Sequence, residues 1–276
     1  MSGAGEGRSA KRDPGVKDFY CAVGPQAARA GYRLEVFTSL ASTNDEAMSR
    51  IAAGDPGRLW IVAATQTRGR GRMGRVWNSP PGNLYASLLL VDPAPPARLA
   101  EIGFVAGVAL IDALRVLAGP GPAILLKWPN DALGDGAKLS GLLLEGASLR
   151  NGQFACVVGV GVNCQSSPVD APYPTASLRS LGAASFDRGA LFAELSERFA
   201  HWLEVWSRGA NFSAIRAAWL ARAGGLGERA QVTRNGEKLE GIFRGIDAQG
   251  RMLLEKAGGA VETIEAGDVA FDPRRA

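Results

Sequence analysis

The chain has 276 residues, with 31 Lys and Arg against 27 Asp and Glu, and its net charge of +4 is too small for a protein that coats nucleic acid. A hydrophobic content of 46% excludes wholesale disorder and is typical of a soluble globular protein. The positive charge is concentrated, because five arginines and no acidic residue lie between Asp55 and Asp92. This cluster favours one focused anion site over a generally basic surface.

The N-terminus, the apolar runs and the cysteines indicate a cytoplasmic protein without membrane contact. Residues 1–15 are polar and rich in Gly, with no apolar segment typical of a secretory signal, and they predict a disordered or irregular lead over residues 1–30. The longest apolar run, at 102–111, is too short to span a bilayer. The three cysteines form no CxxC pair, which favours reduced thiols over a disulfide framework or a zinc site.

The first half of the chain mixes strands and helices without strict alternation. A helix is predicted to begin at Ser42-Thr43-Asn44, with Thr43 and Glu46 as a capping box, and to end at Gly54. The other predicted elements are, in chain order, strands at 32–40, 59–65 and 84–91, a helix at 98–118, and strands at 124–128, 139–145 and 154–162.

The last quarter of the chain has a different pattern. Amphipathic helices are predicted at 188–208 and 214–223, and after them residues 231–268 show short alternating strands separated by Gly-containing turns. This pattern predicts a small all-β domain. The fold class is therefore α+β, with a mixed β-sheet and flanking helices over residues 31–226 and a small C-terminal all-β domain over 227–276.

The arginine cluster contains the segment Gly69-Arg70-Gly71-Arg72-Met73-Gly74, which matches GxGxxG. A dinucleotide site requires a helix at the last glycine, and the Pro-containing residues that follow cannot begin one. Glycines let a backbone approach a ligand closely, and arginines neutralise phosphate or carboxylate groups. Mutual repulsion of the arginines predicts a loop that is mobile until an anion binds. A solvated linker and an RNA-binding tract are the alternatives.

Three further segments combine strand ends with polar residues. Lys127 and Lys138 are the only lysines between Asp18 and Glu237. Lys127 is followed at a predicted strand end by Asn130, a candidate phosphate ligand, and by Asp131, a candidate to hold a metal or a ribose. Gly141 follows Lys138 in the next strand, where a glycine often marks close approach of a ligand. A third strand carries Gly159-Val160-Gly161 and ends at Asn163.

Taken together, these segments resemble biotin–protein ligases. The family pattern is a Ser-Thr-Asn helix start, a GRGRxGR loop, a KWPND strand end, a K-x-x-G-x-L-x-E strand and a GxGxN strand. This sequence has the five motifs in the same order at 42–44, 66–75, 127–131, 138–145 and 159–163. The resemblance implies a class II synthetase-like catalytic domain and, at the C-terminus, an SH3-like barrel.

The resemblance also implies the reaction and its residues. Biotin reacts with ATP to give biotinyl-5′-AMP and pyrophosphate, and the acyl group then passes to a lysine of the biotin carboxyl carrier protein domain of a carboxylase. The implied catalytic residues are Lys138, Arg70 and Arg72. The implied biotin-binding residues are Ser42, Thr43, Asn44, Gln66, Arg70, Gly71, Arg72, Lys138 and Gly141. The implied residues for ATP and the adenylate are Arg72, Trp77, Asn130, Asp131, Lys138 and Asn163.

Further implications concern the metal, the partners and the rival functions. Asp131 is expected to hold Mg²⁺ or to orient the attacking amine. Some family members form homodimers and some carry a DNA-binding domain, for which the roughly 30 residues before the catalytic pattern leave no room, so a monofunctional ligase without DNA binding is expected. A lipoate or octanoate attachment enzyme and a basic-loop nucleic-acid-binding module are the alternative functions.

Overall fold

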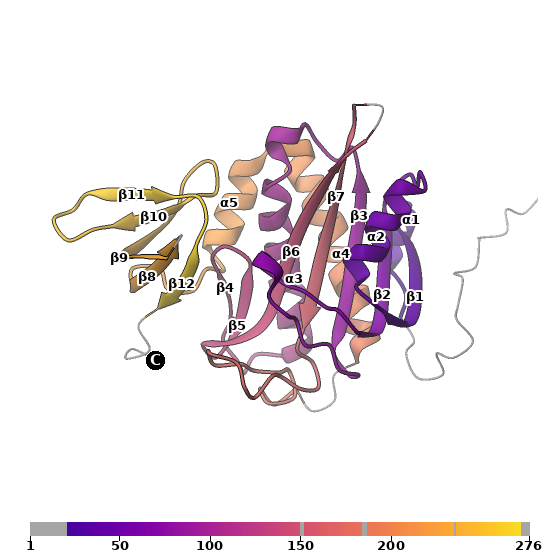
Figure 1. Cartoon of the computed structure of the whole chain (residues 1–276), viewed down its shortest axis with the longest axis horizontal. Coiled ribbons are helices and arrows are strands. Elements are labelled where there is room, and N and C mark those ends of the chain that lie inside the picture. Colours follow the sequence, from indigo (N-terminus) through magenta and orange to yellow (C-terminus); the bar gives the residue numbers. More distant parts are fainter. Residues whose placement is uncertain (1–20, 150–151, 184–186, 235, 272–276) are drawn as a thin grey trace, which may run out of the picture.

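A computed structural model describes residues 21–149, 152–183, 187–234 and 236–271 of the chain (Figure 1). Its larger sheet has seven strands in the order β1-β2-β3-β7-β6-β5-β4, and only the β1–β2 pair is parallel. The strands are β1 (Arg33–Leu40), β2 (Leu59–Gln66), β3 (Leu84–Val91), β4 (Ile124–Lys127), β5 (Asp131–Gly134), β6 (Ala137–Ser148) and β7 (Phe154–Val162).

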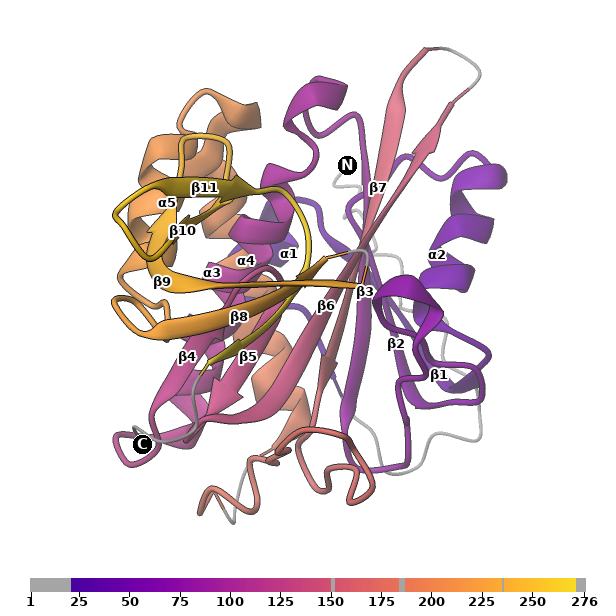
Figure 2. The same cartoon turned by 60° about the vertical axis from the view of Figure 1, so that its left-hand side comes forward.

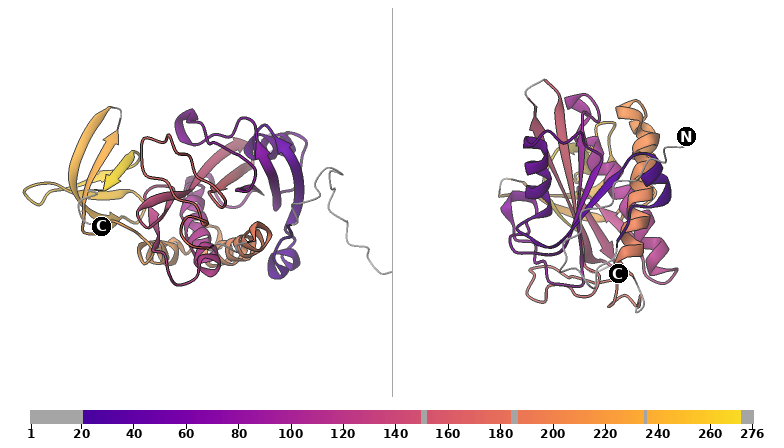
Figure 3. Two further views of the ribbon diagram at one scale, coloured as in Figure 1. Left: turned by 90° about the horizontal axis from the view of Figure 1, so that it is seen from below. Right: turned by 90° about the vertical axis from the view of Figure 1, so that its right-hand side faces the viewer.

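Helices cover both faces of this sheet, as the edge-on view in Figure 3 shows. They are α1 (Pro25–Arg29), α2 (Thr43–Ala52), α3 (Glu101–Ala118), α4 (Arg188–Trp206) and α5 (Phe212–Leu220), with short 3₁₀ turns at Arg72–Gly74, Pro96–Arg98 and Ser207–Gly209. Helix α2 lies against β2, β3 and β7 on one face. Helix α3 packs on the other face and is itself covered by α4 and α5.

The alternation of side chains along β2 explains why both faces can be buried. Leu59 and Ile61 point to the cluster that contains α2, whereas Trp60 and Val62 point to the larger core under α3 and α4. Successive strand residues face opposite sides of a sheet, so a continuous apolar strand such as β2 supplies two cores at once. The ring of Trp60 meets Phe192 and Phe199 edge-on at 5.4 and 5.6 Å.

The second sheet contains five antiparallel strands and lies beyond the β4 edge of the first (Figure 1), and Figure 2 turns this sheet toward the viewer. Its order is β11-β10-β9-β8-β12, with β8 (Arg229–Arg234), β9 (Glu237–Ile246), β10 (Met252–Glu255), β11 (Val261–Ile264) and β12 (Asp268–Phe271). The predicted α+β class and the small C-terminal all-β sheet are thus confirmed.

Several elements differ from their prediction for local reasons. Strand β5 was not predicted, because Asn130-Asp131 resembles a simple turn and the strand has only four residues. Helix α3 begins at Glu101 rather than at 98, after a 3₁₀ turn that starts at Pro96. The irregular lead was predicted to reach residue 30, which is wrong for Pro25–Arg29. These residues form α1, where Ala27 is buried. Residues 1–20 lie outside the described part.

The cysteines fit the prediction of reduced thiols. All three are buried, and none forms a disulfide within the described residues. Burial raises the pKa of the Cys156 and Cys164 thiols to about 12, so both stay protonated and unreactive at neutral pH. Within the described residues, no helix is long and apolar enough to cross a membrane.

The two sheets are joined through the segment that follows β4. Leu126 forms a parallel bridge with Ala223, just before the second sheet begins. The indole N–H of Trp128, a fully buried side chain, donates a hydrogen bond of 3.0 Å to the carbonyl of Gly250 in the turn before β10. A residue of the KWPND motif is therefore fixed directly to the C-terminal sheet.

This contact predicts that Trp128→Phe lowers the free energy of unfolding by more than the loss of ring volume explains. The change leaves the buried Gly250 carbonyl without its donor, which costs about 1–3 kcal/mol. Trp60→Phe is the matched control, because Trp60 is equally buried and its indole nitrogen has no hydrogen-bond partner. Urea denaturation of both variants measures the difference, and equal losses would show that the bond to Gly250 contributes nothing.

Candidate functional site

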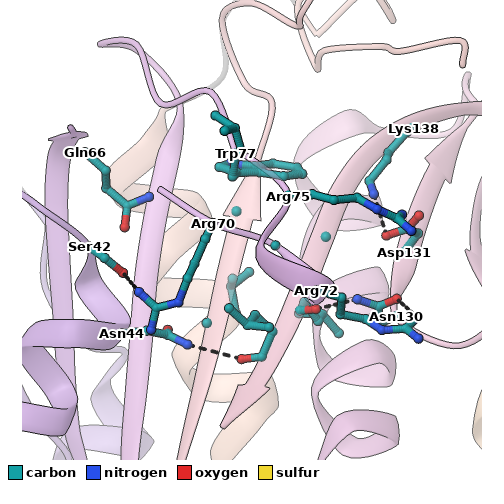
Figure 4. Close-up of a pocket in the computed structure, with 18 of the residues that line it drawn as sticks. Ser42, Asn44, Gln66, Arg70, Arg72, Arg75, Trp77, Asn130, Asp131 and Lys138 are labelled. Atoms are coloured by element: carbon teal, nitrogen blue, oxygen red, sulfur yellow. Dashed lines mark hydrogen bonds and ion pairs between the residues drawn. The ribbon is translucent and has the colours of Figure 1, made fainter. Parts of the chain in front are cut away.

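A cavity lies over the middle of the larger sheet, between the loop after β2 and the strands β6 and β7 (Figure 4). Twelve of the predicted site residues line this cavity. Eleven of them come from the helix start, the loop, the β4–β5 turn and β6, and the twelfth is Gln66 at the end of β2. The predicted residues that line it are Ser42, Thr43, Asn44, Gln66, Arg70, Gly71, Arg72, Trp77, Asn130, Asp131, Lys138 and Gly141. Segments up to 100 residues apart in sequence are thus brought to one place.

Asn163 is the one predicted site residue that does not line this cavity. It is buried, and its amide donates to the carbonyls of Ala176 and Lys138 at 3.1 and 3.4 Å. These bonds join the segment around residue 176 to the strand that carries Lys138. Lys138 also forms an isolated parallel β-bridge with Thr175. A direct contact between Asn163 and a nucleotide remains a prediction.

One end of the cavity is formed by the start of α2. Ser42 is the N-cap of this helix, and its hydroxyl accepts a bond of 3.4 Å from the backbone N–H of Asp45. The predicted capping box on Thr43 and Glu46 is therefore wrong by one position. The Thr43 side chain is instead free to point toward the sheet, where Gln66 Oε1 accepts bonds from its N–H at 2.8 Å and its hydroxyl at 3.1 Å.

A buried hydroxyl on β3 continues this network. Ser87 Oγ lies 2.7 Å from Thr43 Oγ1 and 2.6 Å from Asn44 Oδ1. Gln66 in turn donates from Nε2 to the hydroxyl of Ser79 at 3.0 Å. This end of the cavity thus offers neutral donors and acceptors whose orientations are fixed by one another. Ser87 carries no sequence signal of its own, because it is one polar residue within an apolar strand.

Two glycines of β7 make room for side chains that cross the sheet. A Cβ on Gly159 would lie 2.4 Å from Asn44 Oδ1, and a Cβ on Gly161 would lie 2.6 Å from the indole of Trp77. The sequence predicted that a ligand could approach the backbone closely at these glycines. In the structure the side chains of Asn44 and Trp77 occupy this space instead. The indole nitrogen of Trp77 is buried and has no hydrogen-bond partner.

The other end of the cavity carries most of the charge. Lys138 Nζ lies 2.8 Å from Asp131 Oδ1, and it is 5.7 Å from the Trp77 ring and 5.3 Å from the Tyr173 ring. Arg72 donates to Asn130 Oδ1 at 3.2 Å, so its partner there is neutral. Figure 4 shows four of these side chains together on the side away from Ser42 and Gln66, namely Lys138, Asp131, Arg72 and Asn130.

Three loop arginines, Arg70, Arg72 and Arg75, each have a partner of their own, so the expected mutual repulsion is partly relieved within the protein. Arg75 pairs with Asp268 of β12, which also lines the cavity. The hydrogen bond from Arg75 lowers the pKa of Asp268 despite partial burial, so this carboxylate is ionised at neutral pH. Lys127 does not line the cavity, and burial lowers the pKa of its amine although Asp131 opposes this effect.

Several lining residues were not predicted. Arg75 was counted in the motif without a role, and Tyr173 and Asp268 lie in segments that matched no motif. Their placement depends on long-range packing, which local spacing does not reveal. The unpredicted lining residues are Arg75, Val76, Leu142, Leu143, Gly159, Val160, Gly161, Tyr173 and Asp268.

The arrangement suits a ligand with a neutral polar head and an anionic tail next to a polyphosphate. The neutral end can hydrogen-bond a urea or amide group, and Leu142, Leu143 and Val160 supply an apolar wall. Arg72, Arg75 and Lys138 can neutralise anions at the other end. Such a site aligns a carboxylate with a phosphate more readily than it performs covalent catalysis.

The chain is similar in sequence to known proteins over most of its length. A model of the biotin/lipoate A/B protein ligase family matches residues 36–163, and a model of the biotin protein ligase C-terminal domain matches residues 225–272. A biotin–[acetyl-CoA-carboxylase] ligase from Paracoccus denitrificans is 37% identical, with 83% of this chain and 97% of that protein covered. One from Mycobacterium tuberculosis is 36% identical over 88% of this chain and 90% of that protein.

A solved structure has a similar fold. The biotin protein ligase from Aquifex aeolicus, in complex with biotin and ATP, matches with a TM-score of 0.73 and 25% identity, and covers 87% of this chain and 98% of that one. The two matched family segments include all the lining residues except Tyr173, which lies between them.

The space above Gly159 gives a test that needs no ligand. Gly159→Ala places a methyl group on Asn44 and is expected to lower the free energy of unfolding by about 1–3 kcal/mol, because an overpacked site must shift. The matched control is Gly146→Ala on β6, where the nearest atom is 3.8 Å away. Urea denaturation compares the two, and an unchanged midpoint for Gly159→Ala would mean that Asn44 does not occupy this space.

Proposed function

The chain belongs to the biotin–protein ligase family, and we propose that it joins biotin to a lysine of a carrier domain at the expense of ATP. A carboxylate oxygen of biotin attacks the α-phosphorus of ATP, and the bond to the β-phosphate breaks as pyrophosphate leaves. The carrier lysine amine then attacks the acyl carbon of biotinyl-5′-AMP, loses a proton, and AMP leaves. The observation that carries this proposal is one cavity that joins a neutral hydrogen-bonding end to a cationic end.

The first step must bring two anions together. Two unit charges ~4 Å apart repel by about 4 kcal/mol at an effective dielectric near 20, so positive charge has to offset this term. Lys138 and Arg72 lie on the cavity wall, and among the described residues Arg72 donates to the neutral Asn130 and pairs with no carboxylate. Its charge therefore remains available for a substrate. Positioned charge of this kind is the main source of catalysis in phosphoryl-type transfer.

Lys138 is the proposed central catalytic residue. Its amine is held by Asp131 and two aromatic rings, with a side-chain exposure of 20%. We propose that it lies between the biotin carboxylate and the α-phosphate during adenylation. The aromatic faces attract a cation and leave its N–H donors free for oxygen ligands.

The neutral end is the proposed site for the ureido ring of biotin. A urea presents one acceptor and two donors, and Ser42, Thr43 and Gln66 supply both kinds of group. Gly71 and Gly141 leave backbone accessible beside them. The adenylate is proposed to extend toward Trp77 and Asn130, where the indole nitrogen lacks a partner.

Mg²⁺ is proposed to enter with ATP. Among the residues that the structure describes, no group of three or more His, Cys, Asp or Glu side chains could hold a metal by itself. Magnesium at nucleotide sites is commonly bound by one or two carboxylates together with phosphates and water, so the single carboxylate of Asp131 fits this mode. When bound, the ion would neutralise phosphate charge beside Lys138.

We further propose a catalytic domain at 31–226, a C-terminal domain at 227–276, and a cytoplasmic location. The matched C-terminal family segment begins at residue 225, within two residues of this boundary, and the other matched segment ends well before it, at residue 163. Buried thiols that form no disulfide within the described residues are typical of reducing compartments.

Attachment of lipoate or octanoate is the second candidate, because the matching family model covers both kinds of ligase. The polar network of Thr43, Gln66 and Ser87 favours biotin, since a plain acyl chain has no group to pair with it. Labelling of a carrier domain with ATP and either biotin or octanoate distinguishes the two, and modification with octanoate alone would overturn the assignment.

Lys138→Ala is expected to lower biotin-dependent ATP–pyrophosphate exchange about 10²–10³-fold, because a preorganised cation is removed from the developing charge. Lys238→Ala, an exposed lysine on β9, is the control and should exchange normally. Normal exchange by a folded Lys138→Ala variant would refute the catalytic role.

Arg72→Gly is expected to release biotinyl-5′-AMP prematurely, because the loop loses its contact with Asn130 and a cation facing the adenylate. Chromatography of the adenylate that remains bound after gel filtration measures this release. Arg68→Gly makes the same change at an exposed loop position outside the cavity and should retain the adenylate. Equal retention by both variants would contradict the role of Arg72.

A further inference from the structure

Glu145 lies near the end of β6 and belongs to the K-x-x-G-x-L-x-E motif, yet it does not line the cavity. Its carboxylate accepts two bonds from Arg70 Nη2, at 3.0 Å to Oε1 and 2.9 Å to Oε2. It also accepts a bond of 2.6 Å from Asn44 Nδ2. One carboxylate thus holds a residue of the loop and a residue of α2 at the same time.

These contacts fix the orientation of the Asn44 amide. A carboxylate can only accept, so the nitrogen of Asn44 must face Glu145 and the oxygen must face the hydroxyl of Ser87. A flipped amide would place an oxygen against the carboxylate, which is unfavourable. Asn44 has its strong bonds within the protein and is therefore better suited to hold its neighbours than to select a ligand.

The contacts also change what Arg70 can do. Its Nη1 lies 2.5 Å from Asp45 Oδ1 and 3.4 Å from the Ser42 hydroxyl, so Arg70 bonds two carboxylates at once. Burial lowers its pKa, but the bonds to Glu145 and Asp45 outweigh this and raise it. Arg70 is thus paired with two carboxylates, whereas Lys138 pairs with one, Asp131, and Arg72 pairs with none among the described residues and donates to the neutral Asn130.

We propose that Glu145 is a positioning residue for biotin, which acts by fixing Arg70 and Asn44 and so holds the loop over the neutral end of the cavity before any substrate binds. Arg70 then serves as a tether between the loop, α2 and β6, and anion neutralisation falls to Arg72 and Lys138. This inference rests on the proposed biotin site, but it concerns the order of the empty loop as well as the binding of biotin.

The test is Glu145→Gln, which keeps the size of the side chain and one acceptor but removes the charge that holds Arg70. Steady-state kinetics should show a biotin KM raised about ten-fold or more, with the ATP KM and the kcat at saturating biotin within about two-fold of wild type. The reason is that the variant loses the order of the empty loop, so that biotin binding itself must order it, whereas the contacts made after biotin has bound are kept. A residue that merely stabilised the fold would not produce this split.

A second measurement needs no substrate. Hydrogen exchange should be faster in Glu145→Gln for the loop amides of Gly71 and Trp77, which donate to Arg75 and Gly69 within the loop at 2.7 and 2.9 Å. In an Arg70→Gln background the same change should add less than about two-fold to either effect, since the two residues act as one unit.

Glu35→Gln is the matched control. Glu35 on β1 accepts a bond of 2.7 Å from Arg50 of α2, so it joins the same helix to the sheet but lines no part of the cavity. Its KM values and loop exchange should equal those of the wild type. Urea denaturation checks that every variant is folded.

Three results would overturn the positioning role while leaving the activity in place: an unchanged biotin KM, a loss confined to kcat, or full additivity with Arg70→Gln. A wild-type chain without biotin-dependent exchange would instead overturn the activity, and the role of Glu145 in it.

Discussion

The cavity depends on the absence of side chains at two positions of one central strand. Gly159 and Gly161 lie on β7, between β3 and β6, in the middle of the sheet. A larger residue at Gly159 would meet Asn44, and one at Gly161 would meet Trp77, each at well under 3 Å. A β-strand buried on both sides normally carries large apolar residues, so these glycines weaken the sheet locally in exchange for space above it.

Electrostatic pairing explains how a segment with five arginines folds without a bound anion. Arg70 meets two carboxylates, and Arg75 meets Asp268 of the second sheet. Of these three, Arg72 is the one that pairs with no carboxylate among the described residues. The uneven charge seen in the sequence is therefore compensated by acids that come from distant segments, and one cation is kept for the substrates.

The sequence predicted the larger strands well because their signals are local. Strands β3 and β7 have the predicted limits, 84–91 and 154–162, since continuous apolar runs there end at prolines or polar residues. Strand β5 was missed because four residues carry too little pattern, and the N-cap was misplaced by one residue because Ser42 and Thr43 are chemically equivalent as caps.

The site residues that belong to a motif were predicted, whereas those that only long-range packing brings to the cavity were missed. Eleven of the twelve predicted residues that line the cavity belong to the motifs, and the twelfth, Trp77, follows the loop motif by two residues. Asp268 and Tyr173 reach the cavity through contacts between segments that no local pattern connects. Ser87 is a single polar residue of an apolar strand, and Glu145 belongs to a motif that assigned it no role, so only their distances to Asn44 show that both contact this side chain.

The second sheet takes part in the site through two contacts that begin in different motifs. Arg75 of the loop pairs with Asp268 on β12, and Trp128 beside the β4–β5 turn donates to Gly250 before β10. The first of these contacts lies at the cationic end of the cavity, where Lys138 and Asp131 are found, and the second fixes the residue that follows Lys127 at the end of β4. The neutral end, by contrast, is built from α2, β2, β3, the loop and the strands β6 and β7 of the larger sheet. A displacement of the C-terminal sheet would therefore disturb the anion-binding half of the cavity first and leave the network around Thr43 and Gln66 intact.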